Sequence, residues 1–108
     1  MRIVGVPGSP GKGRGRVLVA NTAEDVPKGK DATSVIIALD SLDPQLVLRL
    51  KGLAGIVCKT GGMTSHGVTI AREMGIPCVC GVGDRFSQLK TGMCIELDGH
   101  RGIMEVQE

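Results

Sequence analysis

The sequence has no tryptophan and no tyrosine, and Phe86 is the single phenylalanine among 108 residues. Proteins that bind single-stranded nucleic acid commonly stack its bases on aromatic side chains, so this absence argues against that class. The formal net charge is only +2, which is too small to indicate nucleic acid or an anionic membrane as a main partner. A hydrophobic core must therefore consist of aliphatic residues, methionine and cysteine.

Long apolar runs are also missing. No stretch approaches the roughly 18 apolar residues of a membrane-spanning helix. Pro7 and Gly8 follow Met1 so closely that the apolar segment of a signal peptide does not form. These absences predict a cytoplasmic protein without a membrane partner. The length suits a single domain over residues 1–108.

Four cysteines occur, and no two of them have the C-x-x-C spacing of a typical metal or redox motif. On a strand, Cys78 and Cys80 would share one face, and two sulfur atoms there can begin a metal site. No histidine or second cysteine pair follows at ligand spacing, so we predict four reduced, structural cysteines and no metal. A small metal-binding protein that uses Cys78 and Cys80 is the alternative. The cysteines are Cys58, Cys78, Cys80 and Cys94.

Strand-like apolar runs alternate with two helix-like segments, which predicts an α/β fold. Residues 5–11 are rich in turn formers, and the basic run 12–16 is typical of a solvated loop. Helices are expected over residues 43–52, after the start signal Asp43-Pro44, and from Thr64 or Ser65 to Gly75. The expected strands cover residues 16–20, 34–39, 53–58 and 76–80, and residues 94–97 and 102–106 form a C-terminal β-hairpin.

The second expected helix has an apolar stripe at helical spacing. Val68 lies at the far edge of that stripe, and His66 falls in the first turn near its other edge. Arg72 points further out, with its neighbour Glu73. The members of the stripe are Gly67, Ile70, Ala71 and Met74.

The start of this helix has the composition of an anion site. Unpaired N–H groups and the positive end of the helix dipole lie there. Gly61 and Gly62 allow close backbone approach to a ligand, and Thr64 and Ser65 supply hydroxyl groups. Neutral His66 would be a nucleophile able to attack phosphorus. From the residues alone, a half-exposed histidine beside an ordinary helix cap stays open as the alternative.

The motif continues beyond the histidine. Residues 70–73 read Ile-Ala-Arg-Glu, residues 75–77 read Gly-Ile-Pro, and residues 81–84 read Gly-Val-Gly-Asp. Together with residues 61–66, this series resembles the phosphohistidine motif of phosphoenolpyruvate-utilising enzymes. That family includes phosphoenolpyruvate synthase, pyruvate phosphate dikinase and the first enzyme of the sugar phosphotransferase system. Weaker similarity at both ends extends the resemblance to nearly the whole chain.

The resemblance implies a compact, swivelling β/β/α domain. In such a domain, His66 accepts a phosphoryl group at one active site and passes it on at another. Thr64 would be the nearest hydroxyl partner of the histidine, and Arg72 would bind phosphate or a partner domain. The phosphate pocket would be shaped by Gly61, Gly62 and Ser65.

The same resemblance predicts no cofactor on this domain. Mg²⁺ with ATP or phosphoenolpyruvate would bind to partners, namely a nucleotide-binding domain and a phosphoenolpyruvate- or pyruvate-binding domain, in one longer protein or as separate subunits. The chain is therefore not expected to turn over alone. Gly67 and Val68 replace the two small residues usual in the family, and Val68 is expected to alter the docking surface. A non-catalytic swivelling domain that serves interaction or regulation is the alternative function.

Overall fold

The computed structural model describes residues 1–20, 34–40, 52–60 and 66–107. Residues 43–51 of the helix expected over residues 43–52 lie outside these ranges. No helix in the described part of the chain has the length and apolar character that a membrane span requires. The elements are β1 (Arg2–Val4), β2 (Val6–Ser9), β3 (Lys12–Val19), β4 (Val35–Leu39), β5 (Gly55–Cys58), α2 (His66–Glu73), β6 (Cys78–Cys80), the 3-10 helix η3 (Gly83–Gln88), β7 (Cys94–Asp98) and β8 (Ile103–Gln107).

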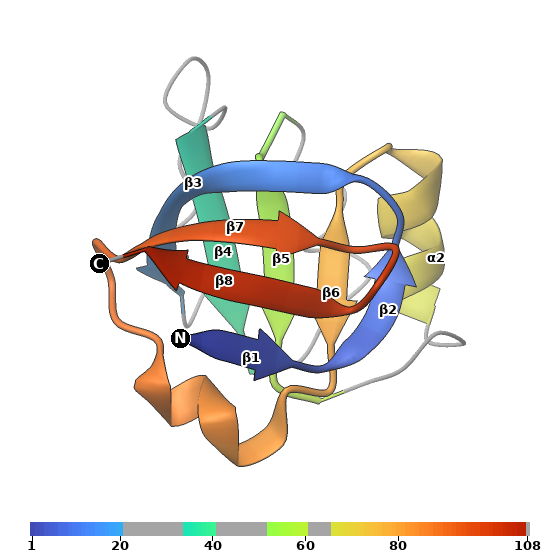
Figure 1. The fold of residues 1–108 in the computed structure, drawn as a ribbon. Helices are drawn as coiled ribbons and strands as arrows, with labels where there is room; N and C mark the ends of the chain where they lie inside the picture. Colours follow the sequence, from blue (N-terminus) through green and yellow to red (C-terminus); the bar gives the residue numbers. More distant parts are fainter. Residues whose placement is uncertain (21–33, 41–51, 61–65, 108) are drawn as a thin grey trace.

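The strands form one eight-stranded mixed sheet in the order β1-β8-β7-β3-β4-β5-β6-β2. β3, β4, β5 and β6 are parallel, and the remaining pairs are antiparallel. The two outermost strands, β1 and β2, are separated in the chain by Gly5 alone. β1 pairs with β8 and β2 pairs with β6, so two consecutive strands form the two edges of the sheet. The sheet therefore curls until these edges lie close together (Figure 1).

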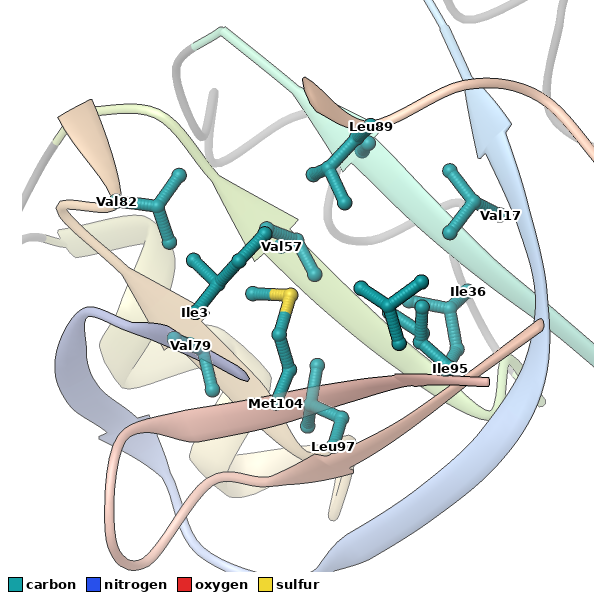
Figure 2. Close-up of a cluster of buried hydrophobic side chains, with 12 residues drawn as sticks. Ile3, Val17, Ile36, Val57, Val79, Val82, Leu89, Ile95, Leu97 and Met104 are labelled. Atoms are coloured by element: carbon teal, nitrogen blue, oxygen red, sulfur yellow. The ribbon is translucent and has the colours of Figure 1, made fainter. Parts of the chain in front are cut away.

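Curling divides the apolar residues into two cores. The concave side holds side chains from seven of the eight strands, and Figure 2 shows Ile3, Val57 and Met104 pointing toward one another there. The other core lies between the sheet and α2, where Val68 and Ala71 pack over the face that carries Cys78 and Cys80. The apolar runs of β4 and β5 are buried on both faces, as is usual for central parallel strands.

The structure corrects the interpretation of the first sixteen residues. Residues 6–9 are a strand rather than a turn, and β3 begins at Lys12 rather than at residue 16. The basic run is therefore not a loop. Its lysine and arginines are exposed, and they alternate with Gly13 and Gly15, whose missing side chains leave room for the backbone at Ala54 and Ser34.

A row of charged side chains crosses the four strands β3, β7, β8 and β1. The strand register places Arg14 opposite Glu96, Glu96 opposite Glu105, and Glu105 opposite Arg2. Like charges directly opposite each other destabilise an antiparallel pair. Here an arginine flanks each glutamate, with Arg2 Nε 2.5 Å from Glu105 Oε1 and Arg14 Nη1 3.7 Å from Glu96 Oε1.

Replacing Arg2 with alanine should therefore expose the repulsion between Glu96 and Glu105. We expect a loss of about 0.5–1 kcal/mol in the free energy of unfolding at low ionic strength, since exposed pairs contribute little. The loss should shrink between about 20 mM and about 500 mM NaCl because salt screens exposed charges. Urea unfolding at both salt concentrations measures it, with Arg101→Ala as an exposed control. A loss that grows with salt would contradict the explanation.

Candidate functional site

Helix α2 is fixed at its carboxyl end by a glycine cap. Gly75 has a φ of 71°, the left-handed region that favours glycine. Its N–H donates to the Arg72 carbonyl at 3.1 Å, and the Ile76 N–H donates to the Ala71 carbonyl at 3.0 Å. This pair of hydrogen bonds is a Schellman motif. The predicted helix stop at Gly75 is confirmed.

The buried face of α2 agrees in part with the predicted stripe, since Gly67 and Ala71 are buried as expected. Val68 and Ala71 are fully buried, whereas Ile70 and Met74 are only partly buried. Val68 therefore belongs to the core, and the expectation that it alters a docking surface is wrong. Ile70 and Met74 still pack against the core, so the structure adds Val68 to the predicted stripe. Thr69, Arg72 and Glu73 are exposed.

His66 is the first residue of α2. Its backbone therefore lies where a helix offers unpaired N–H groups and a positive dipole end. The His66 side chain is outside the described part of the structure. The other predicted residues of the phosphate pocket, Gly61, Gly62, Thr64 and Ser65, also lie outside the described residues.

The described residues that precede residues 61–65 are held by hydrogen bonds to neighbouring strands. After β5, the N–H of Lys59 donates to the Leu39 carbonyl at 3.0 Å, and the N–H of Thr60 donates to the Asp40 carbonyl at 3.1 Å. The hydroxyl of Thr60 donates to the same Asp40 oxygen at 2.9 Å. The chain thus leaves the sheet at the carboxyl ends of β4 and β5.

The carboxyl end of β6 joins the same place. The N–H of Val82 donates to the Cys58 carbonyl at 3.3 Å, and the N–H of Gly83 donates to the Lys59 carbonyl at 3.0 Å. Three parallel strands therefore end together beside the point where residues 61–65 begin. Open α/β sheets bind ligands at the carboxyl ends of their strands. This geometry makes the carboxyl ends of β4, β5 and β6 the candidate site.

Arg72 lies in the last turn of α2, away from the start of the helix. Six residues at 1.5 Å each separate its backbone from that of His66 by about 9 Å along the axis. Its exposed side chain donates from Nε to the Gly8 carbonyl on β2 at 3.0 Å. The structure thus links Arg72 to β2, and its predicted role toward phosphate stays a prediction.

Sequence reasoning missed Asp40 and the link between Arg72 and Gly8. The only local signal for Asp40 is its position directly after the apolar run of β4. The contact between residues 8 and 72 has no local signal, since it depends on the pairing of β2 with β6. The residues that support the candidate site are therefore mostly visible only in three dimensions.

The cysteines are all free thiols in the structure. Cys78 and Cys80 share one face of β6, as predicted, and their sulfur atoms are 3.5 Å apart. Burial raises the pKa of Cys58 to about 12. The described residues contain no group of three or more histidine, cysteine or acidic side chains able to hold a metal.

The chain is similar to known proteins in both sequence and structure. The family model described as PEP-utilising enzyme, mobile domain, matches residues 31–102. Phosphoenolpyruvate synthase from Aeropyrum pernix is 44% identical over 100 residues, which cover 93% of this chain and 12% of that protein. The phosphoenolpyruvate synthase of Pyrococcus furiosus is 40% identical and is also covered to 12% of its length. The chain thus spans a small part of the relatives it matches.

Two solved structures extend the comparison. The solution structure of Enzyme I matches with 35% identity and a TM-score of 0.59, over 68% of this chain and 30% of that one. Holo aconitase X from Thermococcus kodakaraensis matches with a TM-score of 0.75 over 100% of this chain and 99% of that one, but at 22% identity, which shows a shared fold alone. The match over residues 31–102 and these relatives establish that the chain belongs to the family of PEP-utilising enzyme mobile domains.

Proposed function

We propose that this chain is the phosphoryl-carrier domain or subunit of a PEP-utilising phosphotransferase, with His66 as the carrier. One observation carries the proposal: the family match over residues 31–102 includes residues 61–66, and His66 opens α2 beside the carboxyl ends of β4, β5 and β6. The positive end of the helix favours neutral imidazole and a nearby phosphoryl charge.

In the proposed reaction, a neutral ring nitrogen of His66 attacks a phosphorus atom of ATP or phosphoenolpyruvate held on a partner domain. A nitrogen–phosphorus bond forms and a phosphorus–oxygen bond breaks, and the leaving oxygen keeps the bonding electrons. We favour Nε2 because it is the outer nitrogen of the ring. Transfer onward at a second site reverses these roles. Mg²⁺ on the partner domains would neutralise phosphate charge.

The proposed supporting residues are those that match the family motif. Thr64 would donate its hydroxyl to a phosphoryl oxygen, while Gly61, Gly62 and Ser65 would shape the pocket. They follow Thr60 in the sequence, and the hydrogen bonds of Thr60 hold it beside the ends of the parallel strands, which supports this role.

The proposal includes movement between two partners, a nucleotide-binding domain and a phosphoenolpyruvate- or pyruvate-binding domain. Relatives in which this region makes up 12% of the protein support the presence of such domains in those enzymes. A domain with its own two cores can move as a unit. Both proposed donors are cytoplasmic metabolites, so the proposal places the chain in the cytoplasm.

Labelling tests the proposal directly. The chain is incubated with radiolabelled ATP or phosphoenolpyruvate, alone and with each candidate partner domain. We expect no label on the chain alone and an acid-labile, alkali-stable label when a competent donor domain is present. Phosphorus NMR assigns the ring nitrogen. Stable binding to the partners without any label would instead favour the regulatory alternative.

Thr64→Val should slow the proposed transfer while keeping the side-chain shape. Losing one hydrogen bond to a charged group is worth about 1.5–3 kcal/mol, or about a tenfold to a hundredfold decrease in rate. Thr64→Ser should keep most of the rate because the hydroxyl remains. Rapid-quench measurement of labelling gives the rates. Equal rates for the valine and serine variants would remove Thr64 from the proposed site.

A further inference from the structure

The two thiols of β6 are arranged as a pair. Cys78 and Cys80 are fully buried on the face covered by α2, while Val79 between them points into the other core. Their sulfur atoms are 3.5 Å apart and share a hydrogen bond. Two strand residues on one face have Cα atoms about 6.6 Å apart. That separation lies within the range of about 4.4–6.8 Å that disulfides span.

The surroundings shift the pKa values of the two thiols in opposite directions. The mutual hydrogen bond and the nearby Arg72 guanidinium lower the pKa of Cys80, whereas the mutual hydrogen bond and burial raise the pKa of Cys78. The nearby Arg72 guanidinium therefore favours Cys80 over Cys78 as the thiol that forms the nucleophilic thiolate.

The backbone of Gly8 on β2 packs closely against both sulfur atoms. A Cβ atom at Gly8 would lie 3.1 Å from the sulfur of Cys80 and 3.2 Å from that of Cys78. The carbonyl of the same glycine accepts the hydrogen bond from Arg72 Nε. The pair is thus bordered by a backbone without a side chain and by one exposed, charged residue.

We propose that Cys78 and Cys80 are a reversible redox pair that a peroxide converts to an intrastrand disulfide. Their separation, shared strand face and mutual hydrogen bond carry the proposal. Bond formation within the pair is favoured over metal binding because no third donor completes a metal site among the described residues. The inference is independent of the proposed phosphoryl transfer.

The chemistry balances with hydrogen peroxide as the oxidant. The Cys80 thiolate attacks one peroxide oxygen, the O–O bond breaks, and hydroxide leaves to take up a proton as water. The resulting sulfenic acid is attacked by the Cys78 sulfur, so the S–S bond forms and the S–O bond breaks with loss of a second water. Two thiols and one peroxide thus give one disulfide and two waters, with two electrons passing from sulfur to oxygen.

The geometry also predicts easy reversal. The sulfur atoms must approach by about 1.5 Å to reach disulfide length, and the Cα spacing usual for two such strand residues, about 6.6 Å, is near the upper limit of the disulfide range. Such strained disulfides have more oxidising potentials and are readily reduced by small thiols. Because Val68 and Ala71 of α2 pack in the same core, the bond would form directly beneath the helix that begins at His66.

Peptide mapping of the full chain tests the inference without any substitution. The reduced, desalted protein is treated with hydrogen peroxide, denatured, alkylated and cleaved with trypsin. Residues 73–85 form one tryptic peptide that holds Cys78 and Cys80 and no other cysteine. We expect this peptide about 2 Da lighter and unalkylated, a fall from four free thiols to two, and recovery of all four with dithiothreitol.

Variants provide matched controls. Cys94→Ser removes the cysteine outside the buried cluster and should leave the lighter peptide unchanged. Cys80→Ser should prevent its formation, with circular dichroism used to check folding. A peptide 73–85 that remains fully alkylated after peroxide treatment, or a disulfide that maps to Cys58 or Cys94, would overturn the proposal even if the variants fail to fold.

Discussion

Replacing His66 with alanine is expected to abolish phosphoryl labelling of the chain in the presence of a competent donor domain. The substitution removes the only atom proposed to form the nitrogen–phosphorus bond, so no residual covalent route remains. His100→Ala should leave labelling intact. That residue is exposed in the turn between β7 and β8, where its N–H donates to Asp98 Oδ1 at 3.1 Å.

The comparison of the two histidine variants separates chemistry from folding. Labelled chains are digested at alkaline pH, so that a nitrogen–phosphorus bond survives, and the labelled peptide is identified by mass. Thermal unfolding of both variants checks that the cores are intact. Undiminished label in a folded His66→Ala chain would exclude the carrier role proposed for this residue.

The central strands could be predicted from the sequence because their signal is local. The continuous apolar runs of β4 and β5 are buried on both faces, and the structure places these strands within a residue or two of the expected bounds. The end of α2 was also predictable, since Gly75 supplies the backbone conformation that terminates a helix.

Strand β2 and the first half of β3 could not be predicted because glycine conceals their alternation. In the first half of β3, exposed Lys12, Arg14 and Arg16 alternate with Gly13 and Gly15, so no inward-facing apolar residue marks the strand before Val17. β2 contains Pro7 and Gly8 and owes its conformation to pairing with β6, a partner about seventy residues away in the chain. Tertiary contacts here override local turn propensity.

The candidate site also has one part that the sequence predicts and one part that it does not. Residues 61–66 are recognisable from their order along the chain. The arrangement of the described residues beside them is not, because it depends on hydrogen bonds that join Thr60 to Asp40 and Gly83 to Lys59. A sequence motif thus indicates the proposed chemistry, while the parallel arrangement of β4, β5 and β6 determines where the described residue before that motif, Thr60, lies in the fold.

The glycines of β3 show how a close backbone contact holds that parallel arrangement. A Cβ atom at Gly13 would overlap the carbonyl oxygen of Ala54, directly before β5. Gly55, the next residue, offers a contrast: a Cβ there would lie 3.4 Å from the Pro77 carbonyl oxygen and 3.5 Å from a Leu97 methyl carbon, which are ordinary contacts. Neither glycine has a positive φ. The two positions therefore differ mainly in the space available.

Gly13→Ala is accordingly expected to lower the free energy of unfolding by about 3 kcal/mol, because the clash is with backbone and no side-chain rotation relieves it. For a chain of this size that corresponds to a fall of about 10–20 °C in Tm. Gly55→Ala should change stability by less than about 1 kcal/mol, since restricting the unfolded chain offsets any small repacking cost. Urea and thermal unfolding followed by circular dichroism measure both variants. Equal stability losses would show that β3 can shift away from Ala54, and that this contact does not fix the sheet at the start of β5.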